Sequence, residues 1–153
     1  MIEAGSLDFS TKSRLGPLGA RLEWFLLMTI PFGDPRTYQI IGAAMEVHRT
    51  LHRGYLERIY CDALAVEFEL REVPFTRDAT CQLFYKGRLL TGHHRLDFVC
   101  FDEVVVEIKA QSSIGPAEEA QVLNYLALTH KRIGLLLNFG ERSLAQKCFI
   151  LDP

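Results

Sequence analysis

Hydrophobic residues recur at helical spacing in two early segments of the chain. Between residues 37 and 51 they stand three or four positions apart, at Ile40, Ile41, Ala44, Val47 and Leu51, which predicts an amphipathic helix. Gly54 interrupts the pattern, and a second helix is predicted from about residue 56 to 71, before Val73-Pro74. Its stripe consists of Leu56, Tyr60, Ala63, Leu64 and Leu70.

Strand patterns and one further helix fill the rest of the chain. Strands are predicted over 80–85, 95–101, 104–110, 132–138 and 144–151, with a turn at Lys86-Gly87. A helix is predicted from Pro116 to about residue 130, with Glu118 and Glu119 in its first turn. The order ααβββαββ predicts an α/β (α+β) fold in which helices flank a central sheet.

Residues 1–35 have a different pattern from the rest. Residues 1–19 mix Gly, Ser, Lys and Pro without periodicity, and an apolar run follows at 24–32. That run is too short to span a bilayer, which takes about 20 residues, and acidic residues dilute any signal-peptide character. We therefore expect residues 1–35 to form a poorly ordered extension and residues 36–153 to form the domain.

Charge and cysteine content narrow the functional classes. The 153 residues include 17 Lys and Arg against 19 Asp and Glu, a net charge of -2, which excludes a polybasic protein that binds nucleic acid by bulk charge alone. The four cysteines, Cys61, Cys81, Cys100 and Cys148, form no CxxC pair. We expect reduced thiols in the cytoplasm, without a disulfide framework or a zinc site.

The segment 95–109 holds an acidic constellation. Glu107 and Lys109 are two apart on a predicted strand, so their side chains share a face. A three-residue loop at 101–103 would pair residue 100 with 104, and therefore Asp97 with Glu107. This register leaves the opposite face wholly apolar, at Phe98, Cys100, Val104, Val106 and Ile108, so we predict it over a two-residue loop.

Converging carboxylates and a lysine suit phosphodiester hydrolysis. Two carboxylates repel each other unless a hard divalent cation such as Mg²⁺ or Mn²⁺ lies between them. A neighbouring lysine can orient water and offset charge in the transition state. The same spacing is also typical of a strand-edge Glu107–Lys109 ion pair, with Asp97 a polar residue near a turn.

Other polar residues are candidates for the same site. Glu57 opens the second helix on its packing face, and Gln121 and Tyr125 lie one turn apart on the third helix. The alternatives are a glutamate that complements the helix dipole and two polar residues flanking a buried helix. The position of His48 on an apolar stripe indicates a hydrogen-bonded core histidine. The cationic cluster of Lys86, Arg88 and residues 93–95 is typical of either a solvated loop or a phosphate contact.

These motifs together resemble a known family. Residues 54–60 match GxxExxY, the pattern of the GxxExxY proteins, a branch of the PD-(D/E)XK nuclease superfamily. Asp97 with Glu107-Ile108-Lys109 resembles the D…ExK signature, and 121–126 resembles the QxxxY motif. The resemblance covers about residues 37–151, and the one local departure is His52, where the family usually has glycine.

The resemblance implies a restriction-endonuclease-like αβββαβ core. It implies metal binding by Glu57, Asp97 and Glu107, a catalytic role for Lys109, and supporting roles for Gln121 and Tyr125. We therefore expect an Mg²⁺-dependent (or Mn²⁺-dependent) nuclease that acts on DNA or RNA.

Two other functions stay open. One is a catalytically silent module on the same fold that binds nucleic acid or a partner protein, and the other is a purely structural role for the carboxylates. We expect no membrane association. A homodimer and an accessory protein are both open, because so small a chain shows no evident DNA-gripping domain.

Overall fold

The computed structural model describes residues 33–92 and 94–151. The expected N-terminal extension therefore lies almost entirely outside the described residues. The elements are α2 (Pro35–Leu51), α3 (Glu57–Leu70), β1 (Phe75–Cys81), β2 (Phe84–Tyr85), β3 (Arg88–Leu89), β4 (His94–Cys100), β5 (Val104–Lys109), α4 (Pro116–Thr129), β6 (Ile133–Asn138) and β7 (Ala145–Ile150).

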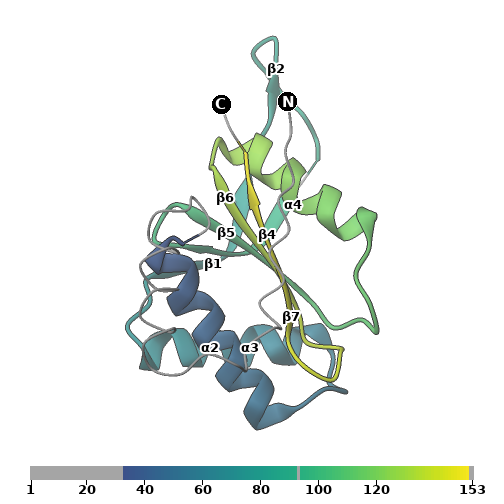
Figure 1. The fold of residues 1–153 in the computed structure, drawn as a ribbon. Coiled ribbons are helices and arrows are strands. Elements are labelled where there is room, and N and C mark those ends of the chain that lie inside the picture. The colour runs from purple at the N-terminus through teal and green to yellow at the C-terminus, as the bar shows by residue number, and fades with distance from the viewer. Residues whose placement is uncertain (1–32, 93, 152–153) are drawn as a thin grey trace.

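Five strands form one mixed sheet in the order β1-β4-β5-β6-β7, and β2 pairs only with β3. β5 and β6 run parallel, and the other neighbours run antiparallel. Helices α2 and α3 cover one face of the sheet and α4 crosses the other, as Figure 1 shows. This is the predicted fold class, a central mixed sheet flanked by helices in a restriction-endonuclease-like arrangement.

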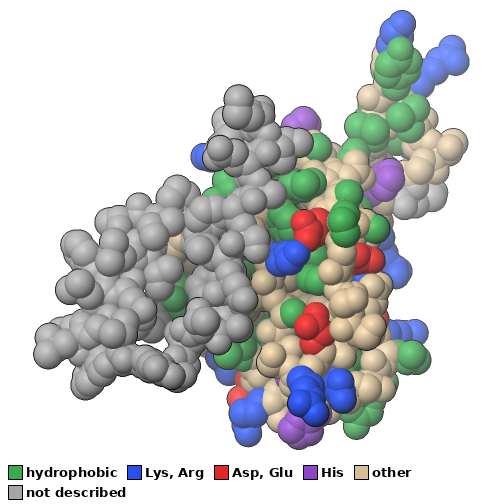
Figure 2. All heavy atoms as spheres, turned by 45° about the vertical axis from the view of Figure 1, so that its right-hand side comes forward, with side chains coloured by type: hydrophobic (Ala, Val, Ile, Leu, Met, Phe, Trp, Pro, Cys, Tyr) green, Lys and Arg blue, Asp and Glu red, His purple; other side chains and the backbone are tan. Residues whose placement is uncertain are grey.

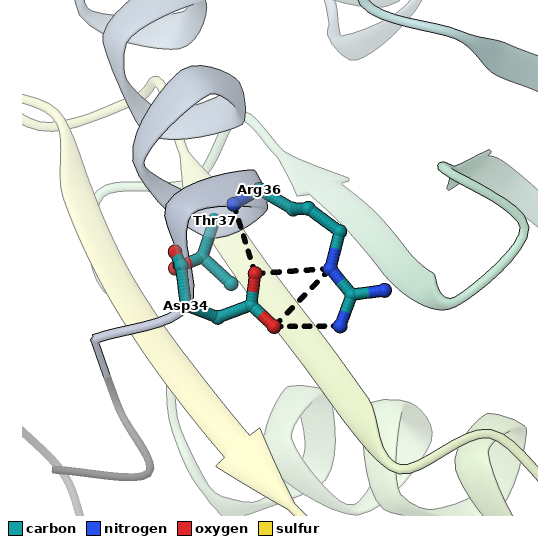
Figure 3. Close-up of polar contacts among 3 residues, drawn as sticks. All are labelled: Asp34, Arg36 and Thr37. Atoms are coloured by element: carbon teal, nitrogen blue, oxygen red, sulfur yellow. Dashed lines mark hydrogen bonds and ion pairs between the residues drawn. The ribbon is translucent and has the colours of Figure 1, made fainter. Parts of the chain in front are cut away.

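The start of α2 is fixed by Asp34. Its carboxylate accepts the Arg36 backbone N–H at 2.8 Å and is also bonded by the Arg36 guanidinium, at 2.6 Å for the shortest contact (Figure 3). An aspartate at the N-cap followed by proline at the first helical position is a standard helix start. The hydrogen bond from Arg36 lowers the pKa of Asp34, so the cap is charged at neutral pH.

Each face of the sheet has its own hydrophobic core. On one face, Tyr60, Leu64 and Phe68 of α3 pack with α2 against Phe98, Val106 and Ile108. On the other, Val122, Tyr125 and Leu126 of α4 pack against Val105 and Leu136. The contact of α4 is close at Gly134, where a Cβ atom would lie 2.6 Å from Val122 Cγ1, so the helix rests directly on the backbone of β6.

The β4–β5 hairpin has the predicted three-residue loop. Cys100 pairs with Val104 and Phe98 with Val106. The loop closes with Phe101 and Asp102 both at positive φ, 54° and 57°. The apolar face predicted for this hairpin is confirmed, since its five residues all belong to the core beneath α2 and α3.

Two predictions differ from the structure. The single strand predicted over 80–85 is divided between β1, which begins earlier at Phe75, and the separate short strand β2. β1 is an edge strand whose alternate residues are exposed, so its polar Thr76, Arg77 and Asp78 concealed its first half. Leu56 and Leu70, expected on the buried stripe of α3, are 78% and 75% exposed because they lie at the two ends of the helix.

None of the helices in the described ranges is long and apolar enough to cross a membrane. All four cysteines are free thiols, and three of them are buried.

Candidate active site

Strand β5 brings Glu107 and Lys109 together on the face covered by α4. Lys109 Nζ donates to Glu107 Oε1 at 2.8 Å, and the two side chains are only 12% and 4% exposed. The intervening Ile108 points into the opposite core. A buried ion pair is costly unless further partners or ligands satisfy it, so the environment of this pair is informative.

Asp97 reaches the pair from the neighbouring strand. The ladder between β4 and β5 ends at Phe98 and Val106. Beyond that point Asp97 Oδ2 accepts the backbone N–H of Ile108 at 2.8 Å. The carboxylate thus takes the place of a ladder partner at the point where the two strands stop pairing.

A change of face occurs at Asp97. Phe98 packs in the core beneath α2 and α3, whereas Leu96 packs in the core beneath α4. Simple alternation would put both on one face, so β4 is irregular here, next to Asp78, which has a φ of 54°. The sequence predicted the register correctly but could not indicate this irregularity.

Helix α4 adds the two polar residues predicted from its spacing. Gln121 Nε2 donates to Glu107 Oε1 at 2.7 Å and lies 2.9 Å from the hydroxyl of Tyr125. Glu107 Oε1 therefore accepts from both Lys109 and Gln121, which fixes the orientation of the carboxylate. Gln121 therefore does more than flank a buried helix, because its side chain bonds directly to Glu107.

Glu57 is the first residue of α3 and lies near enough to Lys109 and Asp97 for their charges to affect its pKa. Its preceding loop is anchored by Tyr60, whose hydroxyl donates to His52 O at 2.7 Å and accepts from Tyr55 N at 3.2 Å. Gly54 has a φ of 118°, which L residues rarely adopt. The glycine and tyrosine of the GxxExxY pattern therefore both shape the turn that leads into Glu57.

The three carboxylates lie within electrostatic range of one another. Burial and the charge of Asp97 raise the pKa of Glu57, against the opposing effect of Lys109. The Cys61 thiol, one turn after Glu57, has a pKa raised to about 12 by burial and then by the charges of Asp97, Glu57 and Glu107. No group of three Asp, Glu, His or Cys side chains in residues 33–92 and 94–151 is arranged closely enough to hold an ion.

Glu107 is the most perturbed acid of the cluster. Burial and the charge of Asp97 raise its pKa to about 7, although Lys109 acts in the opposite direction. Burial likewise raises the pKa of Asp97. Burial alone would lower the pKa of Lys109, but its hydrogen bond to Glu107 and the nearby carboxylates raise it. The site therefore has more negative charge than its single lysine balances.

One oxygen of Glu107 has no partner. In the described part of the chain, Glu107 Oε2 is the one buried side-chain nitrogen or oxygen atom without a hydrogen bond. An unpaired buried acceptor costs roughly 1–3 kcal/mol. An orphaned carboxylate oxygen, hard oxygen donors and excess negative charge all fit a divalent cation such as Mg²⁺.

Asn138 was not singled out by sequence analysis. This side chain is fully buried at the end of β6. Asn138 Oδ1 accepts a hydrogen bond from Gln111 N at 2.9 Å. Asn138 Nδ2 donates to Gln111 O at 2.9 Å and to Glu141 Oε1 at 3.0 Å. It ties the loop after Lys109 to the loop after β6. The available signal was an asparagine as the last residue of an apolar strand, before Phe139-Gly140.

The remaining candidates lie outside this cluster. His48 is buried, and its Nε2 lies 3.1 Å from Glu141 O, which confirms a hydrogen-bonded core histidine. Arg95 is largely exposed and lies 3.4 Å from Asp78.

Comparison with known proteins agrees with the geometry. The family model of the PD-(D/E)XK nuclease superfamily matches residues 34–148. No curated protein and no solved structure matches the chain. Because the match spans most of the chain and includes every residue of the cluster, the chain belongs to the PD-(D/E)XK nuclease superfamily.

Proposed function

We propose that this protein is a nuclease of the GxxExxY branch that hydrolyses phosphodiester bonds in DNA or RNA and requires Mg²⁺ or Mn²⁺. The observation that carries the proposal is the buried Glu107, which is bonded to Lys109 and Gln121 through one oxygen and has no partner for the other. A purely structural ion pair would not require a buried carboxylate oxygen without a partner, in a carboxylate whose pKa is also raised by two further acids.

Asp97 and Glu107 would hold the cation, and Glu57 would complete or orient its surroundings. A divalent cation there would neutralise charge on the phosphate and make a water molecule easier to deprotonate. Asp97 is held in place by the Ile108 backbone N–H, and Glu107 by the Gln121 amide. Each carboxylate is therefore held by a hydrogen bond at one oxygen, and a cation would have to draw the acids closer together to bind all three.

Lys109 is the residue best placed to act on the reacting groups. Its raised pKa keeps the amine protonated at neutral pH. A protonated amine can orient the attacking water and stabilise the charge that develops on the phosphate oxygens. Gln121 holds the partner carboxylate of Lys109, and Tyr125 holds Gln121, so these two are positioning residues.

The proposal is tested by a cleavage panel with the full chain. Single- and double-stranded DNA and RNA are incubated with Mg²⁺, with Mn²⁺ and with EDTA, using wild type, Lys109→Ala and Lys147→Ala. Lys147 is a matched control, because it also forms an ion pair with a glutamate, Glu119 of α4, but lies two strands away from Glu107 in the sheet.

We expect metal-dependent cleavage of at least one substrate by wild type and by Lys147→Ala. Lys109→Ala should lower the rate by about a hundredfold or more, the usual effect of removing one transition-state donor. Absence of cleavage in every condition, or an unchanged rate in a folded Lys109→Ala protein, would refute the proposal. Metal-independent binding of a probe without cleavage would instead favour a silent binding module.

A further inference from the structure

The β2–β3 hairpin projects from the body of the protein. Its two strands pair only with each other, Phe84 with Leu89 and Tyr85 with Arg88, and a third bond joins Leu90 N to Leu83 O. Lys86 and Gly87 form the turn, both at positive φ. Figure 2 shows the hairpin extending away from the molecule, with Lys and Arg side chains at its tip and hydrophobic side chains below them.

This hairpin exposes more apolar surface than its own structure explains. Phe84 and Tyr85 are 59% and 61% exposed, and Leu83, Leu89 and Leu90 are also exposed. Neighbouring residues of a strand point to opposite faces, so each face of the hairpin offers one aromatic ring. A two-stranded hairpin of this size is marginally stable alone in water, and large exposed apolar patches mark binding sites.

The charge of the hairpin is uniformly positive. Residues 79–96 contain no Asp or Glu but include Lys86, Arg88 and Arg95, whereas the whole chain has more acids than Lys and Arg. Lys86 Nζ lies 5.5 Å from the centre of the Tyr85 ring. Exposed aromatic rings next to cations are typical of surfaces that bind single-stranded nucleic acid, because bases stack on the rings and phosphates contact the cations. They fit an acidic or apolar protein surface less well.

The hairpin also leaves the sheet at the end where the active-site cluster lies. Cys81 pairs with His94 at the base of the hairpin. β4 begins at His94, three residues before Asp97, and runs antiparallel to β5, so the base of the hairpin and Lys109 at the end of β5 lie toward the same end of these two strands. Ala79 and Cys81 pack against the core beneath α4, the helix that supplies Gln121. Figure 1 shows the hairpin beyond α4 and away from α2 and α3.

We propose that the β2–β3 hairpin binds unpaired nucleotides of a nucleic acid strand whose phosphates continue toward the active-site cluster. Bases stack on Phe84 and Tyr85, and Lys86 and Arg88 contact the phosphates beside them. This inference rests on the proposed function, because it takes the strand bound at the hairpin to be the substrate of the active-site cluster. It adds to that function a preference for single-stranded or locally unpaired substrates.

Fluorescence anisotropy tests the proposal with labelled single-stranded and duplex oligonucleotides of DNA and RNA. The full chain carries Lys109→Ala throughout, so that cleavage does not consume the probe. Tyr85→Ser is compared with Leu70→Ser, which removes another exposed apolar side chain, at the end of α3. Arg88→Gln is compared with Arg71→Gln, which removes another exposed guanidinium, at the far end of α3 from Glu57.

We expect Tyr85→Ser to weaken single-strand binding by about fivefold to a hundredfold, the range measured for loss of one base–aromatic stack. Arg88→Gln should weaken binding and reduce the salt slope by about 0.7, the value for one phosphate contact on a single strand. Both control variants should bind as the parent does.

Hairpin variants that bind as tightly as their controls would overturn the inference. So would a preference for duplex over single-stranded probes, or a parent protein that binds no probe. A changed oligomeric state in Tyr85→Ser with unaltered nucleic-acid affinity would show that the hairpin contacts a second copy instead.

The hairpin inference and the nuclease proposal can fail separately. Cleavage by wild type with an unchanged KM in Tyr85→Ser would leave the nuclease proposal intact and reject the hairpin. Hairpin-dependent binding without any metal-dependent cleavage would support the hairpin inference and reject the nuclease proposal.

Discussion

Glu107 couples the stability of the protein to pH. Its pKa in the folded protein is about 7, whereas an unfolded glutamate titrates near 4.3. Between these values the folded state holds a proton that the unfolded state has lost. Linkage then requires that the free energy of unfolding of the metal-free protein falls as pH rises through this window.

Replacing Glu107 with Gln removes that titration. In EDTA, wild type should lose up to about 1.4 kcal/mol of unfolding free energy per pH unit between roughly pH 5 and 7 relative to Glu107→Gln. The stability of Glu107→Gln relative to wild type should therefore be greater at pH 8 than at pH 5, while the variant cleaves substrate poorly. Urea unfolding across this pH range measures the difference, and parallel curves for the two proteins would contradict the assignment.

Divalent cations should offset the repulsion among these carboxylates and so stabilise the folded protein. A ligand that binds only the folded protein raises its stability, so Mg²⁺ at pH 8 should raise the Tm of wild type. Asp97→Asn, which keeps the shape of the side chain but loses its charge, should show little or no shift. Asp62→Asn is the matched control, since Asp62 is ion-paired with Arg77 and exposed, and it should respond to Mg²⁺ as wild type does.

The sequence indicated individual site residues to different degrees. Glu107 and Lys109 could be paired because strand alternation is strict over a run of valine and isoleucine. Gln121 was indicated by its helical spacing with Tyr125 together with the resemblance to the QxxxY motif. Asn138 could not be identified, because its role depends on the loop after β5 and the loop after β6, which are far apart in sequence.

At the scale of elements, the site depends on how the ends of β5 and β6 are held together. Lys109 pairs with Asn138 across the parallel strands, and Phe139 N donates to Lys109 O at 2.8 Å. Phe139 in turn stacks on Tyr60, with ring centroids 4.7 Å apart. This contact links the strand ends to the turn before Glu57, so one packed unit positions residues from α3 and β5.

Gly140 is the most restrictive position in that unit. A Cβ atom there would lie 2.1 Å from Gln111 O, so Gly140→Ala must push the two loops apart. We expect a loss of about 1–3 kcal/mol in unfolding free energy and a lower cleavage rate.

Gly42→Ala is the control for Gly140→Ala. It lies inside α2, with Arg71 Nη1 3.5 Å away as the nearest atom, and should stabilise the protein by up to about 1 kcal/mol. Thermal unfolding of both variants is the measurement, and equal effects would contradict this account of the strand ends.

The order of the helices and of the five sheet strands was predictable because their patterns are local, whereas the short strand β3 was not predicted. The β4–β5 register was also predictable, because only one loop length sorts charged from apolar residues. The division of the first predicted strand was not, since β1 gains its partner from β4, many residues later. The change of face at Asp97 results from tertiary packing that alternation cannot indicate.

At the scale of the whole molecule, the charge distribution matters more than its total. A net charge of -2 gives no bulk attraction to nucleic acid, and part of the negative charge is concentrated in the cluster where phosphate would bind. Without a cation, Glu57, Asp97 and Glu107 would repel a phosphate group at this cluster.

Nucleic-acid binding should therefore depend on divalent cations as well as on the hairpin. With Lys109→Ala to prevent cleavage, we expect binding in Mg²⁺ to be at least about tenfold tighter than in EDTA, which corresponds to 1.4 kcal/mol. The added substitution Asp97→Asn should abolish this difference. Equal affinity with and without Mg²⁺ would mean that the carboxylates do not face the bound strand.

The layered fold was predictable as a whole, whereas the projecting hairpin was only partly so. The turn at Lys86-Gly87 is evident from sequence, but nothing in the pattern shows that Phe84 and Tyr85 stay exposed rather than join the sheet. The exposure of Phe84 and Tyr85 depends on where β1 and β4 stop pairing, which is a property of the assembled sheet.

The most direct test of the central claim is the single-turnover cleavage rate as a function of Mg²⁺ concentration for wild type, Glu107→Gln and Lys147→Ala. We predict a rate that saturates with Mg²⁺ in wild type and in Lys147→Ala, and that falls by about a hundredfold or more in Glu107→Gln. A rate that is independent of Mg²⁺, or that is the same in Glu107→Gln as in wild type, would contradict the assignment of this cluster as a metal-dependent active site.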